Sequence, residues 1–301
     1  MADLDQEQLY RGEEATRATT DVDAGIKTIL LHVQNDTALD RTLEAALSLA
    51  RACEAHLTCL HVTPIQAYVA FDSFGGVFVM SDVFKAIEEE ERLLKERLQV
   101  ELSKEDVSWD YIQTTGDVPH QLIGRAALAD LVVTSRQPKR TDFQGPAIGM
   151  LGDLLHRSRT PLFIVADDGK VPDPTGRVLI AWNGSFEAAN AVRSAVGLLK
   201  LASGVRILRI DEKKEEAFPS TLLLEYLSRH GIHAELQVET AHPDMRDSDF
   251  VSSCLKAEAE QMNAAYIVMG GYSHNRVSEY MFGGLTRSML AASSTPLFIA
   301  H

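Results

Sequence analysis

Two glycine-containing segments near the end of the chain are the strongest candidates for binding chemistry. Gly270 follows an apolar run that ends in Met269, and the pair Gly283-Gly284 opens a helical pattern thirteen residues later. A glycine at a strand end lets backbone N–H groups approach an anion, and a helix start adds free N–H groups and the positive end of its dipole. The pattern predicts a phosphate site, with simple turn chemistry as the alternative. Nearby groups that supply a hydroxyl or positive charge are Thr286, His274, Arg276 and Arg287.

Other chemistries lack a sequence signature. The chain contains no zinc-helix histidine pair, no C-x-x-C and no P-loop. Ser185 and Ser294 have no evident His/Asp set, so no hydrolase triad is predicted. The three cysteines, Cys53, Cys59 and Cys254, are too few and too odd in number for a disulfide framework; we interpret them as small buried residues in a reducing compartment, with redox chemistry as the alternative. No catalytic residue and no metal ligand is predicted, and whether the protein is an enzyme stays open.

Composition excludes several classes of protein. The 301 residues include 29 Lys and Arg against 43 Asp and Glu, a net charge of −14, and 45% are hydrophobic. This balance is typical of a globular protein rather than a disordered one. The acidic excess disfavours nucleic acid as a partner, and no apolar run approaches the ~20 residues that cross a bilayer. The acidic residues 1–23 do not resemble a secretory signal, so we expect a cytoplasmic protein.

The chain contains an internal repeat. Thr28–Val33 (TILLHV) is matched by Arg177–Trp182 (RVLIAW), and Thr160–Ile164 (TPLFI) recurs letter for letter as Thr295–Ile299. Two further apolar runs match in the same order, which indicates duplication of one module. The predicted organisation is an acidic lead-in 1–23, a first domain 24–168, a linker 169–174 and a second domain 175–301.

The repeated runs are short and rich in Val, Ile and Leu, as in strands buried on both faces of a parallel sheet. Helical patterns alternate with them, for example Leu39–Glu54 and its copy Phe186–Leu201. This alternation predicts an α/β fold of two doubly wound, Rossmann-like domains, each a mostly parallel five-stranded sheet flanked by helices. Ligands bind such sheets at the carboxyl ends of the strands, where the strand order reverses.

Each copy also has an insertion. The first copy has 24 extra residues, which include the aromatic stretch Tyr68–Met80 ahead of a charged helix over Ser81–Glu101. Because apolar loops are costly to leave in water, we expect this stretch to pack on its own domain, the sister domain, a partner or a ligand. The second copy has 11 extra residues, which we place in an acidic, solvated loop around Asp244–Asp249, with cation binding by its carboxylates as the alternative.

The repeat and the glycine loop resemble the universal stress protein family in its tandem, two-domain form. The family pattern is G-x-x-G, nine residues, then G-[S/T], after an apolar strand that ends in Met. Here Gly270 and Gly283 match at the required spacing, whereas Ser273 stands at the second glycine and Gly284 at the Ser/Thr. The resemblance implies a universal stress protein fold and a role in the stress response.

The resemblance also implies a nucleotide site in the second domain. In nucleotide-binding members an Asp ends the first strand, where this chain has Asn183, and the end of the second strand, here Ile210, offers its backbone to the base. The implied ligand is ATP, with Mg²⁺, or another adenine nucleotide. The first copy has diverged further, so we expect no nucleotide there; the positions that depart are Gln34, Ser135, Pro138 and Ile148.

The final strands, Pro161–Val165 and Pro296–Ala300, resemble the family's edge strand that mediates domain pairing. We therefore expect the two domains to pair within the chain, and leave a homodimer open. Two other functions stay open: a nucleotide-free interaction module that acts through its surfaces, and a slow ATPase or phosphotransferase.

Overall fold

The structure is a computed structural model that describes residues 24–64, 70–71, 77–78, 81–136, 146–166, 171–211, 218–240, 248–271 and 283–301. The strands of the first half are β1 Thr28–Val33, β2 His56–Pro64, β5 Trp109–Gly116, β6 Leu131–Ser135 and β7 Leu162–Val165. Those of the second half are β8 Arg177–Trp182, β9 Gly204–Asp211, β10 Ala234–Thr240, β11 Tyr266–Gly270 and β12 Leu297–Ala300. The helices are α1 Leu39–Cys53, α2 Ser81–Leu102, α3 Val118–Ala126, α4 Pro146–Ser158, α5 Phe186–Leu201, α6 Ser220–Arg229, α7 Ser248–Gln261 and α8 Gly284–Ala292.

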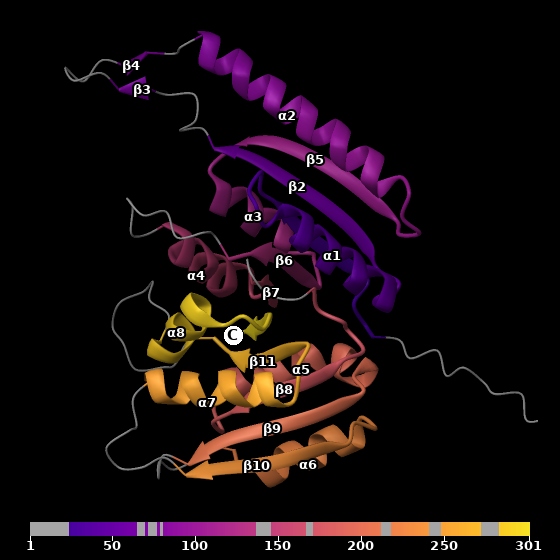
Figure 1. Ribbon diagram of the computed structural model, residues 1–301, viewed down its shortest axis with the longest axis vertical. Coiled ribbons are helices and arrows are strands. Elements are labelled where there is room, and N and C mark those ends of the chain that lie inside the picture. The colour runs from indigo at the N-terminus through magenta and orange to yellow at the C-terminus, as the bar shows by residue number, and fades with distance from the viewer. Residues whose placement is uncertain are drawn as a thin grey trace, which may run out of the picture.

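These ten strands form one sheet in the order β10-β9-β8-β11-β12-β7-β6-β1-β2-β5 (Figure 1). Within each half, all neighbouring strands are parallel, and the two halves have mirror-image orders. The expected α/β fold of two doubly wound five-stranded sheets is therefore confirmed. The domain limits, with a linker at 169–174, stay a prediction because residues 167–170 lie outside the described part of the chain.

Helices cover both faces of the sheet, and each face has one hydrophobic core that continues through both halves. Buried residues of α1, α2, α5 and α6 line one core, and those of α3, α4, α7 and α8 line the other. The central strands bury both faces, as the continuous apolar runs Leu131–Val133 and Tyr266–Val268 require. Within the described residues, no helix is both long and apolar enough to span a membrane, and none of the three cysteines is in a disulfide.

The halves meet where β7 pairs with β12 in the antiparallel direction, with Phe163 beside Phe298. The contacts on either side of this seam repeat each other. Arg136 of the first half donates to the carbonyl oxygen of Leu290 in the second half (3.1 Å). In the repeat, Gly271 corresponds to Arg136 and Leu155 corresponds to Leu290, and Gly271 packs on Leu155. The seam therefore has the approximate twofold symmetry of a dimer made within one chain.

The insertions are described in part. In the first, β3 Ala70–Phe71 and β4 Val77–Phe78 form a two-stranded antiparallel sheet, while the rest of Tyr68–Met80, and with it the expected packing, lies outside the described residues. The following helix α2 packs Leu94, Leu98 and Leu102 into the core. In the second, residues 241–247 are not described, and Asp249 belongs to the first turn of α7 rather than to a loop, where the helix dipole favours its charge.

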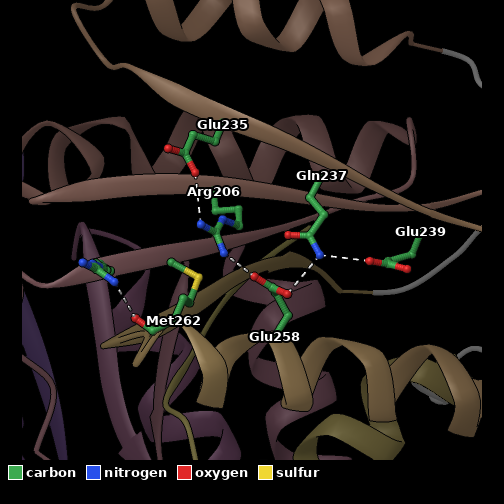
Figure 2. Close-up of polar contacts among 7 residues, drawn as sticks. Arg206, Glu235, Gln237, Glu239, Glu258 and Met262 are labelled. Carbon is green, nitrogen blue, oxygen red and sulfur yellow. Dashed lines mark hydrogen bonds and ion pairs between the residues drawn. The ribbon is translucent and has the colours of Figure 1, made fainter.

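A polar network holds α7 against the β9–β10 edge of the sheet (Figure 2). The guanidinium of Arg206 on β9 donates to Glu258 Oε1 on α7 (2.6 Å) and to Glu235 Oε2 on β10 (3.0 Å). Gln237 Nε2 donates to the other oxygen of Glu258 (3.1 Å) and to Glu239 (2.9 Å). The Glu258 side chain is only 7% exposed, so these donors take the place of water around its carboxylate.

The substitution Arg206→Gln is expected to lower the free energy of unfolding by about 2–3 kcal/mol, because it leaves the buried Glu258 carboxylate without its cation. The matched change Glu235→Gln removes an exposed partner of the same arginine and is expected to cost within about 0.5 kcal/mol. Urea unfolding of the two variants checks this. Equal losses would show that the network does not depend on the buried pair.

Candidate functional site

The candidate site of the second half lies where the strand order reverses, between β8 and β11. From β8 the chain crosses to β9 on one side, and from β10 it returns to β11 on the other. Val268 of β11 pairs with Ile180 of β8, so Trp182 and Gly270 end their strands at the same edge of the sheet. The two loops diverge there, which is where doubly wound sheets bind ligands.

Asn183 follows β8 directly and is exposed. Its Oδ1 accepts from the backbone N–H of Ser185 (3.2 Å), and the Ser185 hydroxyl in turn caps α5 by accepting from Ala188 N–H (3.2 Å). The oxygen of Asn183 therefore orders the loop that starts α5, and its NH₂ group is the part left for a ligand.

Gly270 has a packing role that the sequence pattern did not indicate. A Cβ at this position would lie 2.6 Å from both Ala188 N and the carbonyl carbon of Glu187. Only glycine lets the first turn of α5 come this close to the end of β11. Met269, the residue before it, is buried in the core, so the strand end is held rigidly whether or not an anion binds.

The second glycine pair starts helix α8, as predicted. Gly283 is the N-cap, with φ −57° and no side-chain cap, and Gly284 is the first helical residue. The N–H groups of Gly284, Leu285 and Thr286 thus have no acceptor within the helix. The Thr286 side chain is only 4% exposed, so the backbone carries most of what α8 offers to an anion. Since α8 connects β11 to β12, its first turn lies at the carboxyl edge of β11.

The remaining predicted residues divide into two groups. Ile210 is half-buried near the end of β9, where it pairs with Glu239 of β10. Ser273, His274 and Arg276 belong to residues 272–282, which lie outside the described part of the chain, so their roles stay predictions. Among the described residues, no three His, Cys, Asp or Glu side chains gather into a metal site.

The site also contains groups that sequence reasoning missed. Phe186 begins α5 with 60% of its surface exposed, and its ring meets that of Phe218 edge-on, with centroids 4.8 Å apart. Phe218 N–H donates to the carbonyl oxygen of Gly184 (3.1 Å), which ties the segment after β9 to the loop after β8. A large aromatic residue directly after N-G-S, at a helix start, is a signal that could have found Phe186.

Two buried polar atoms lie near these aromatic residues in the chain. Trp182 Nε1, in the last residue of β8, and Ser220 Oγ, in the first residue of α6, have no hydrogen-bond partner among the described residues. Buried donors and acceptors are nearly always paired in folded proteins. Both residues are positioned by elements that end or begin at the carboxyl edge, next to Asn183 and Phe218.

The same edge of the first half is filled by its own side chains. Gln34, at the position of Asn183, donates from Nε2 to the hydroxyl of Ser135 (2.9 Å), which stands at the position of Gly270. His32 Nδ1 hydrogen-bonds to Thr134 Oγ1 (3.2 Å) beside them. The helix of this half starts at Pro146, before the matched position Ile148, and Pro138 lies outside the described residues. These groups satisfy each other instead of facing an open edge.

The geometry defines a class: a chain of two doubly wound α/β domains, paired edge to edge, with a carboxyl edge of the type that binds ligands in the second half. No family model matches the chain, and neither does any curated protein. Solved structures do. A universal stress protein from Archaeoglobus fulgidus matches with a TM-score of 0.68 at 17% identity, over 90% of this chain and 97% of that one. A protein described as a universal stress protein from Pseudomonas aeruginosa matches with a TM-score of 0.55 at 16% identity, over 92% and 94%.

The chain therefore has the universal stress protein fold, with two copies of the domain in one polypeptide. The resemblance inferred from the glycine loop and the repeat is confirmed at the level of the fold.

His32, a buried histidine of the first half, provides a test. Burial, with a smaller effect from His61, lowers the pKa of His32 to about 4, so the folded protein holds this imidazole neutral. Above the unfolded pKa of 6.5, His32 adds no pH dependence. As the pH falls from 6.5 towards 4, the unfolded chain binds the proton first, and stability is lost by roughly 3 kcal/mol.

The measurement is the free energy of unfolding of His32→Gln and of wild type at pH 7, 5.5 and 4.5. We expect the difference between them to shift in favour of the variant as the pH falls. The exposed His120→Gln serves as the control and is expected to follow wild type. A constant difference for His32→Gln would contradict a neutral buried imidazole.

Proposed function

We propose that this protein is a universal stress protein that acts in the stress response and binds ATP, or another adenine nucleotide, at the carboxyl edge of its second half. The fold shared with the Archaeoglobus and Pseudomonas proteins supports the role. The observation that carries the binding proposal is the first turn of α8, whose N-cap is a glycine without a side-chain cap.

The first turn of α8 fits a phosphate group. Three backbone N–H groups without intrahelical acceptors, together with the helix dipole, form the usual anion site at a helix N-terminus. A polar side chain at Gly283 would compete for these N–H groups, and glycine leaves them open. Mg²⁺ would arrive with ATP and neutralise its phosphates.

The other end of the edge fits a nucleoside. Phe186, which is 60% exposed, offers aromatic surface on which a base can stack, and the half-buried Phe218 supports its ring edge-on. Asn183 NH₂, Trp182 Nε1 and Ser220 Oγ are polar atoms near the same strand ends. A ligand with an aromatic base, a polar sugar and an anionic tail matches this order of groups.

The structure of the first half supports a nucleotide site in the second half only. Its matching edge is closed by the bond between Gln34 and Ser135 and by that between His32 and Thr134. A nucleotide would have to break these bonds before it gained its own. We therefore propose one nucleotide per chain.

Unfolding with and without ATP tests the proposal. A real site raises the free energy of unfolding by about 2.7 kcal/mol when ATP is at a hundredfold excess over Kd. Gly283→Asp is expected to abolish this gain, because it brings a negative charge to the phosphate position while remaining a good N-cap. Gly283→Ala, which adds neither a charge nor a side-chain acceptor and is compatible with the φ of −57° at this position, is the control and is expected to retain most of the gain.

An unchanged melting temperature of wild type at millimolar ATP would contradict nucleotide binding. Release of ADP from Mg-ATP by wild type, absent in Gly283→Asp, would identify a slow ATPase and would change the proposed function from binding to turnover.

Phe186→Ala tests the nucleoside end. Because a base stacked on an aromatic side chain contributes about 1–3 kcal/mol, we expect this variant to bind ATP at least about fivefold more weakly by calorimetry. Leu128→Ala, which truncates another exposed apolar side chain far from this edge, is expected to bind as wild type does. Equal affinity of Phe186→Ala and wild type would place the base elsewhere.

A further inference from the structure

A cleft of about 580 Å³ lies between the halves, away from the carboxyl edge described above. One wall is formed by the segments that lead into β1, β6 and β7, at the amino ends of the strands of the first half. The other wall is formed by α5 of the second half and by the end of α6. The volume is in the range of sites for small molecules.

The two walls are in close contact at one point. The chain at Ala24 passes directly over Gly197 of α5, so closely that a Cβ at Gly197 would overlap the carbonyl oxygen of Ala24. Both residues are part of the cleft lining. The cleft is therefore a fixed feature of how the halves pack and not a gap between independent parts.

The lining is basic in a protein with a net charge of −14. Arg159, Arg193 and Lys200 are exposed in the cleft, and none of them has an ion-pair partner among the described residues. His230, half-buried on Tyr226, lines the same space. Among the described residues of the lining, Asp130 is the one acid, and its Oδ2 already accepts from the backbone N–H groups of Lys27 and Thr28 and from the Thr28 hydroxyl, each at 2.9 Å.

Comparison of the two halves shows that this charge is specific to α5. The buried faces of α1 and α5 coincide when residues 149 positions apart are matched, for example Leu43 with Val192. At that offset Arg193 corresponds to Glu44 and Lys200 to Arg51. In α1 these two positions form an ion pair at 3.4 Å. In α5 both are cations on one helix face, seven residues apart, so mutual neutralisation is lost.

We propose that this cleft is a second binding site, and that its ligand is a compact polyanion with two or more phosphate groups. Two arginines and a lysine supply three permanent positive charges, and the planar guanidinium forks match phosphate oxygens. Ser194 adds a hydroxyl on α5. The ligand would touch both halves and so stabilise their packing. This site is separate from the proposed nucleotide site, because it lies at amino ends of strands in the first half.

Isothermal titration of the full chain with inorganic pyrophosphate at low ionic strength tests the proposal, since screening weakens exposed charges. Wild type is expected to bind, and Arg193→Gln/Lys200→Gln is expected to bind at least tenfold more weakly. Both positions are exposed, so the variant should fold, which circular dichroism checks. Lys85→Gln/Lys104→Gln removes the same charge from exposed positions on and after α2 and is expected to bind within twofold of wild type.

Three results would overturn the proposal: no binding of millimolar pyrophosphate to wild type, an equal loss in the α2 control, or loss of pyrophosphate binding in Gly283→Asp, which would assign it to the nucleotide site. Citrate is the comparison ligand, and preference for citrate over pyrophosphate would also overturn the phosphate assignment. Retention of pyrophosphate binding by a protein that fails to bind ATP would leave this site standing and remove only the nucleotide proposal.

Discussion

Strands β7 and β12 are only four residues long, yet their antiparallel pairing joins two parallel five-stranded sheets into one and sets how the two halves lie relative to each other. Left apart, each would be an exposed apolar edge, since Phe163 and Phe298 have no surface exposed in the paired form. The pairing also makes both hydrophobic cores continuous across the molecule. Helix α5, which flanks the seam on one face, is thereby brought against the first half, and the interdomain cleft follows from that arrangement.

Duplication produced two equivalent sets of positions, and the structure uses them differently. At the carboxyl edge, Gln34 of the first half bonds across to Ser135 on the neighbouring strand, whereas Asn183 of the second half bonds within its own loop, to Ser185. On the helices at the seam, Glu44 and Arg51 neutralise each other, whereas Arg193 and Lys200 do not. In both cases the backbone is retained, and side-chain changes at two matched positions separate paired side chains from a surface suited to anions.

The fold could be predicted because its signals are local and repeated. The runs at Thr28–Val33 and Arg177–Trp182 are too apolar for exposed strands, and the recurrence of TPLFI identifies the duplicated strand at the seam. The start of α8 at Gly283 was predictable for the same reason, since helix starts are coded by adjacent residues. The structure of the acidic stretch was harder to predict. The sequence predicts a loop at Asp249, but Ser248 and Asp249 begin helix α7, and Asp249 accepts a hydrogen bond from Ser288 of α8.

The sequence by itself determined the elements, their order and the duplication, because periodicity, capping and repeats are properties of neighbouring residues. Tertiary structure decided which residues share a site. Gly270 meets Ala188 and Phe186 meets Phe218 only when the strands end at one edge. Likewise Arg159 and Arg193, from different halves, line one cleft only because β7 pairs with β12. Contacts between residues far apart in the chain depend on the packing of whole elements, which no local pattern encodes.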